Sequence, residues 1–190
     1  MDNRFLAGAA SRRSFLSGAL AGAAAFTSAS LIPGLAAAES DNIRSLSFRS
    51  LHTGEEVTAT YLRNGVVEAD GLQQLNHVLR DWRSGEVWEM DRGLLDLLYA
   101  LRRKMDSDAP FELISGYRSP KTNAGLAAKS KGVAKRSLHM RGMAVDVRLP
   151  ERDLKALHQA ALALKGGGVG LYTKSGFIHL DTGRVRRWGA

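Results

Sequence analysis

The stretch SLHMRGMAVDV, Ser137 to Val147, contains a histidine and an aspartate seven residues apart and continues as an alternating strand pattern. Neighbours on one face of a helix are three or four residues apart, so a helix would not bring His139 and Asp146 side by side. Gly142 between them predicts a bend, after which Asp146 lies on one face of a strand and the valines lie on the other. Such a strand aspartate needs a cationic partner if it is buried.

A second histidine has a similar setting near the C-terminus. Residues 176–181 (GFIHLD) alternate as a strand in which His179 and Asp181 share a face. If this strand lies near the first, His139, Asp146 and His179 converge. Two imidazoles and one carboxylate are a common set of ligands for catalytic zinc, with the fourth tetrahedral position left for water. Each residue alone is more typical of a structural role, so spacing by itself leaves the metal site a hypothesis.

The remaining pattern predicts an α+β domain, in which a small antiparallel sheet carries this site on one face and helices flank the sheet. Asp91 and the pair Ser119-Pro120 are helix start signals. The glycine run at 166–170 is interpreted as a helix stop. Strands are expected at 43–50, 56–62, 111–115, 143–149, 168–172 and 176–181, and helices at 71–83, 92–104, about 120–129 and 152–165.

Residues 1–38 are predicted to be a twin-arginine signal peptide, and residues 39–190 a single domain. The segment SRRSFL opens a run rich in glycine and alanine, which ends in LAAA before Glu39. A transmembrane anchor is the alternative, but this run contains glycines, Pro33 and several hydroxyls, which weaken it as a spanning helix. We therefore expect export to the periplasm, without stable membrane insertion after cleavage.

The charge and the cysteine content of the chain restrict the classes of partner and site that it can have. The 190 residues carry a formal net charge of +8 and no cysteine, and removal of residues 1–38 lowers the charge to +6. The lack of cysteine excludes disulfides, thiolate metal sites and cysteine nucleophiles. Basic charge alone would permit a nucleic-acid partner. For an exported protein we expect anionic envelope polymers instead, and no nucleic acid.

Several motifs, taken together in order, resemble the zinc peptidases of the lysostaphin, D-Ala-D-Ala carboxypeptidase and hedgehog group. These motifs are SGYRS at 115–119, H-x-x-G-x-A-x-D at 139–146 and the late His179. The sequence is most similar to the exported YcbK-like murein endopeptidases. That similarity extends from about residue 45 to the C-terminus and includes LHTGE at 51–55, GVAK at 132–135, GGVG at 167–170 and H-x-D-T-G at 179–183.

The resemblance implies a hedgehog or D-Ala-D-Ala peptidase-like fold with Zn²⁺ held by His139, Asp146 and His179. It also implies hydrolysis of peptide bonds in the stems or cross-links of peptidoglycan. By the same resemblance, Arg118 holds substrate or stabilises the developing oxyanion. An arginine after a turn is about as common in a structural salt bridge.

One departure from the family concerns the general base. Many relatives have Glu three residues, or His two residues, before the last ligand, where this chain has Gly176 and Phe177. Asp181, about 7 Å along the strand from that ligand, is the candidate base, or it orients the ligand imidazole. Tyr117 and Tyr172 are candidates for substrate binding. Because the usual base is missing, a zinc-containing but catalytically inactive peptidoglycan-binding module is the alternative function.

Overall fold

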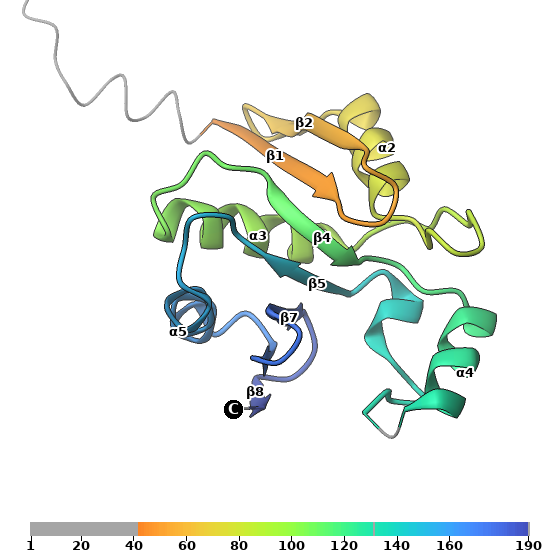
Figure 1. The fold of residues 1–190 in the computed structure, drawn as a ribbon. Helices are drawn as coiled ribbons and strands as arrows, with labels where there is room; N and C mark the ends of the chain where they lie inside the picture. The colour runs from red at the N-terminus through yellow and green to blue at the C-terminus, as the bar shows by residue number, and fades with distance from the viewer. Residues whose placement is uncertain (1–41, 131, 190) are drawn as a thin grey trace, which may run out of the picture. The chain divides into compact units, whose positions relative to one another are not determined.

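A computed structural model describes residues 42–130 and 132–189, which form one mixed α+β fold (Figure 1). The predicted signal peptide lies outside the described residues. Within them, four α-helices accompany eight strands that belong to a single sheet, in the order β3-β2-β1-β4-β5-β7-β6-β8. The α+β class predicted from the sequence is confirmed.

The elements follow one another in an order close to that expected. They are β1 (Ile43–Ser50), β2 (Glu56–Arg63), β3 (Val66–Val67), α2 (Ala69–Val78), α3 (Arg92–Lys104), β4 (Phe111–Ser115), α4 (Pro120–Lys129), the 3₁₀ helix η1 (Leu138–Arg141), β5 (Ala144–Arg148), α5 (Leu154–Leu164), β6 (Gly168–Tyr172), β7 (Phe177–Asp181) and β8 (Arg186–Gly189).

The sheet is larger than predicted, and it is mixed rather than antiparallel. β1 pairs with β4 and β6 pairs with β8 in parallel, whereas the other neighbouring strands are antiparallel. Between β1 and β4 the chain passes through β2, β3, α2 and α3, and two parallel neighbouring strands need a long connection of this kind. β8 reads RRWG and was not predicted, because it has no alternating apolar pattern.

The hydrophobic core lies between the sheet and helices α2, α3 and α5. α2 contacts β1 and β2, α3 contacts β1 and α5, and α5 contacts β6 and β7. In Figure 1, α2 and α3 lie behind the strands. On β5, Val145 and Val147 are fully buried in the core cluster, so Asp146 and Arg148 point to the opposite face. We call this opposite side the open face of the sheet, and it carries the candidate site.

Helix boundaries agree with the sequence except at α2. α3 spans 92–104 as predicted, and the Asp91 carboxylate accepts the N–H of Leu94 at 3.0 Å. The helix predicted at 71–83 ends early, because the chain turns away and the carbonyl of Leu79 accepts the N–H of Tyr117 at 2.7 Å. None of the helices described here is long and apolar enough to cross a membrane.

Candidate metal centre

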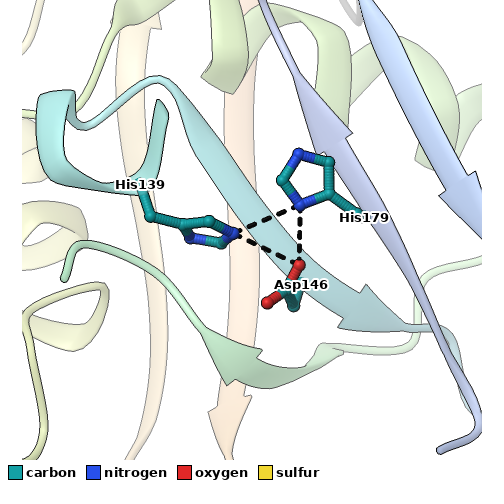
Figure 2. A group of neighbouring side chains, drawn as sticks. All are labelled: His139, Asp146 and His179. Carbon is teal, nitrogen blue, oxygen red and sulfur yellow. Dashed lines mark hydrogen bonds and ion pairs between the residues drawn. The ribbon is translucent and has the colours of Figure 1, made fainter. Parts of the chain in front are cut away.

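Three side chains converge on the open face, where η1, β5 and β7 meet (Figure 2). Asp146 of β5 lies directly opposite His179 of β7 in the strand register, and His139 reaches them from η1. Asp146 Oδ1 is 2.9 Å from His179 Nδ1 and 3.3 Å from His139 Nε2, and the two imidazole nitrogens are 3.2 Å apart. The three residues predicted to meet therefore lie together.

The bend expected at Gly142 delivers His139 to this point. Gly142 follows η1 with φ of 65°, a left-handed conformation that costs a residue with a side chain about 1–2 kcal/mol. A Cβ at this position would also lie 2.4 Å from the carbonyl oxygen of Glu89. Both observations explain why glycine separates the histidine from the strand that carries the aspartate.

The spacing of the three facing atoms fits a tetrahedral zinc ion. Zinc bonds of about 2.0–2.1 Å at tetrahedral angles place ligand atoms about 3.3 Å apart. The observed separations of 2.9, 3.2 and 3.3 Å are at or slightly below that value. In the part of the chain that the structure describes, this is the one group of three or more acidic or histidine side chains with such geometry.

Each of the three side chains is also held through its outer polar atom. His139 Nδ1 lies 2.6 Å from the carbonyl oxygen of Gly116, so it carries the proton and Nε2 presents a lone pair. Asp146 Oδ2 accepts from Arg118 at 2.6 Å. His179 Nε2 donates to Asp181 Oδ2 at 3.0 Å, which leaves the Nδ1 lone pair facing inward.

The electrostatics of the cluster favour a cation. Burial lowers the pKa of His139, and the charge of Asp146 offsets this only in part. Burial raises the pKa of Asp146, but the charges and hydrogen bonds of the two histidines outweigh it and hold that pKa well below its usual range. Burial lowers the pKa of His179, but hydrogen bonds to Asp146 and Asp181 outweigh it and raise that pKa. The lowered pKa values keep His139 neutral and Asp146 ionised, which are the forms that bind a divalent ion.

Asp181 lies behind His179, on the side of the ring away from the three facing atoms. Its carboxylate is fully buried and accepts the backbone N–H groups of Gly168 at 3.1 Å and Gly183 at 2.9 Å. Arg186 donates to both oxygens, at 3.0 and 2.7 Å. Sequence reasoning missed Arg186, although it lies only three residues after the H-x-D-T-G motif.

The glycine run at 166–170 has a second role that its interpretation as a helix stop did not include. A Cβ at Gly168 would lie 2.3 Å from the guanidinium of Arg186, and one at Gly170 would lie 2.5 Å from the indole of Trp188. The glycines therefore let two side chains of β8 cross β6 toward the site. The His179 and Trp188 ring centroids are 5.1 Å apart as a result.

The three side chains lie in a cleft of about 510 Å³. Arg118 lines it, and so does Tyr172 from the end of β6. The Tyr172 hydroxyl accepts the indole N–H of Trp188 at 3.0 Å, so its own proton can be donated elsewhere. One further wall comes from the basic segment that precedes η1, including Arg136.

Tyr117, a candidate for substrate binding, is not among the residues that line this cleft. Its side chain is buried, its hydroxyl donates to Glu86 at 2.7 Å, and its ring stacks on Trp88 with centroids 5.4 Å apart. The residue after a strand end can point either way, and the backbone bond to Leu79 turns this one inward. Tyr117 therefore supports the turn that positions Arg118.

An α+β domain with two imidazoles and a carboxylate in an open cleft has a set of side chains that could hold a metal ion within reach of a substrate. The chain belongs to the Peptidase_M15_2 family, because the profile described as peptidoglycan L,D-endopeptidase MepK matches residues 38–188. The resemblance to the YcbK-like group is thereby confirmed.

Two named relatives illustrate the similarity. The peptidoglycan L,D-endopeptidase MepK of Escherichia coli strain K12 is 40% identical over 179 residues, which cover 94% of this chain and 97% of that protein. The probable peptidoglycan L,D-endopeptidase MepK of Haemophilus influenzae is 40% identical over 147 residues, which cover 76% of this chain and 78% of that protein.

Proposed function

We propose that this protein is a zinc-dependent murein endopeptidase that hydrolyses L,D peptide cross-links in peptidoglycan. The observation that carries the proposal is the convergence of His139, Asp146 and His179 in an open cleft, each held through its outer atom. Family membership and the names of the relatives support the substrate class. The signal-like residues 1–38 support export to the periplasm by the twin-arginine pathway.

The metal would be held by His139 Nε2, Asp146 Oδ1 and His179 Nδ1, whose spacing suits zinc. When bound, zinc supplies a water of lowered pKa and polarises the scissile carbonyl, so no protein nucleophile is needed. The protein would orient the lone pairs of the two ligand imidazoles in advance of metal binding. The hydrogen bonds of His139 to Gly116 and of His179 to Asp181 support this role.

Two side chains in the cleft are suited to bind the peptide. The Arg118 guanidinium is held by Ser115 at 2.9 Å and by Asp146 at 2.6 Å, and it is fixed in place to stabilise negative charge that develops on the carbonyl oxygen. Tyr172 can donate its hydroxyl proton to a substrate carbonyl.

For Asp181 we propose a positioning role rather than that of general base. Its two oxygens already accept hydrogen bonds from His179, Arg186 and two backbone amides, and the carboxylate is fully buried. The His179 ring stands between this carboxylate and the three facing atoms. A base must reach the proton that it removes within about 3 Å or through one water, so this arrangement favours orientation of the imidazole.

Mass spectrometry of muropeptides tests this function. Zinc-loaded protein incubated with sacculi should convert cross-linked dimers into monomers, and a chelated sample should not. Asp146→Asn should abolish the conversion. The matched control, Asp153→Asn at the N-cap of α5, should leave it intact, because asparagine caps helices as well as aspartate does. Full turnover by the Asp146 variant or by the chelated protein would contradict the proposal.

The second candidate function is an inactive, zinc-containing module that binds peptidoglycan. It is favoured by the lack of a free acid or histidine at the positions of Gly176 and Phe177, where many relatives have a base. This module would bind zinc and sacculi but release no soluble fragments. The same mass spectra therefore separate the two functions.

A further inference from the structure

On the open face, in the row of residues next to the metal centre, two arginines cover a buried acid. Glu112 of β4 is 6% exposed, and it lies opposite Arg49 of β1 and Arg148 of β5 in the strand register. Arg49 donates through Nη2 to Glu112 Oε1, and Arg148 donates through Nε to Oε2. Each carboxylate oxygen therefore has its own guanidinium.

The two arginines have donor capacity beyond what Glu112 uses. Their side chains are 47% and 45% exposed, whereas the carboxylate between them is buried. Within the described ranges, 42–130 and 132–189, neither guanidinium has another hydrogen-bond partner for its remaining N–H groups. One acid held by two arginines also leaves a net positive charge on this part of the surface.

The position of the pair relative to the metal centre suggests a ligand. Arg148 follows Asp146 by two residues on β5, so both point to the open face about 7 Å apart along the strand. An extended peptide advances about 3.3 Å per residue. A substrate with its scissile bond at the centre would thus bring a group two residues away close to Arg148.

We propose that Arg49 and Arg148 form a subsite for a carboxylate of the substrate peptide, and that Glu112 holds the two guanidiniums in place. The proposal rests on the proposed function, because peptidoglycan stem peptides carry free carboxylates at short intervals. Guanidinium groups bind carboxylates through paired N–H donors, and fixing them beforehand lowers the entropy that binding costs. Glu112 provides this fixation, because both arginines are tied to its buried oxygens.

A binding experiment with two ligands tests the subsite. A soluble L,D cross-linked muropeptide and the same compound with amidated carboxylates are titrated into the full chain, with chelator present to prevent turnover. Wild type should bind the free acid more tightly. Arg148→Gln and Arg49→Gln should each weaken binding of the free acid about tenfold and leave the amide unchanged, since a charge-assisted hydrogen bond is lost.

The matched control is Arg63→Gln, which removes an arginine that is also 47% exposed and also paired with a glutamate, but on β2. It should bind both ligands as wild type does. If Arg148→Gln does not fold, Arg148→Lys keeps Glu112 paired and should still reduce the preference for the free acid, because an ammonium lacks the guanidinium fork.

Two outcomes would overturn the subsite. If the arginine variants weaken binding of both ligands equally, or of neither ligand, then the two arginines only neutralise Glu112. If wild type shows no preference for the free acid, the subsite fails, while muropeptide cleavage by the zinc-loaded protein tests the proposed function separately. By contrast, a wild-type preference that depends on Arg148, in a protein that cleaves nothing when loaded with zinc, would leave the subsite standing and contradict the endopeptidase function.

Discussion

The substitution Asp181→Asn should lower the affinity for zinc without creating a cavity in the core. Every hydrogen-bond partner of the Asp181 carboxylate is a donor, in the backbone of Gly168 and Gly183 and in the side chains of His179 and Arg186. Asparagine keeps the shape but offers one oxygen and an amino group. If the oxygen keeps the place of Oδ1, the amino group meets His179 Nε2, which must then give up its proton.

The consequence for the metal follows from the tautomer. A His179 ring that accepts at Nε2 carries its proton on Nδ1, the atom that faces Asp146 and His139. Loss of such an orienting partner typically lowers metal affinity by about 10- to 100-fold, or about 1.4–2.7 kcal/mol. The lost charge-assisted bonds to Arg186 should cost a further ~1.5–3 kcal/mol of unfolding free energy.

Zinc affinity is measured by competition with a chromophoric chelator, and the free energy of unfolding by urea titration of the metal-free protein. Asp153→Asn is the control and should change neither quantity. If folded Asp181→Asn binds zinc as tightly as wild type but hydrolyses slowly, then Asp181 is the general base. The positioning role would then be refuted.

Four further substitutions test the backbone and the core. Gly142→Ala should cost at least about 2 kcal/mol of stability from its left-handed φ and its close carbonyl, whereas Gly125→Ala, with open space in a helix, should gain about 0.5–1 kcal/mol. Gly170→Ala should displace Trp188 and move one resonance in fluorine NMR of fluorotryptophan-labelled protein. Tyr117→Phe should cost about 1 kcal/mol in urea unfolding with kcat/KM unchanged.

For each of these substitutions, one outcome would contradict the expected result. Equal stability of the two glycine variants would show that the turn after η1 tolerates a side chain. An unmoved tryptophan spectrum would mean that β6 shifts instead of the indole. A large fall in kcat/KM for the tyrosine variant, at wild-type stability, would restore the substrate-binding role first assigned to that residue.

The convergence of the three side chains could be predicted because it depends on patterns local to short segments. Strand alternation fixes the face of Asp146 and of His179 whatever the rest of the sheet does, and Gly142 fixes the turn that precedes the first of these strands. The prediction also assumed that the two strands lie near each other. In the structure β5 and β7 are neighbours, and Asp146 lies directly opposite His179.

What could not be predicted depends on contacts between distant segments. Glu112 and its two arginines come from three strands, and no periodicity relates their positions in the sequence. Arg186 belongs to a strand whose pairing with β6 is possible because Gly168 has no side chain, so the signal for β8 lies in another segment altogether. A glycine after a helix is first interpreted as a helix stop. Glycines at alternate positions of a strand, such as Gly168 and Gly170, also predict that side chains of a neighbouring strand cross over them. This rule would have indicated that side chains such as those of Arg186 and Trp188 lie beside the candidate metal centre.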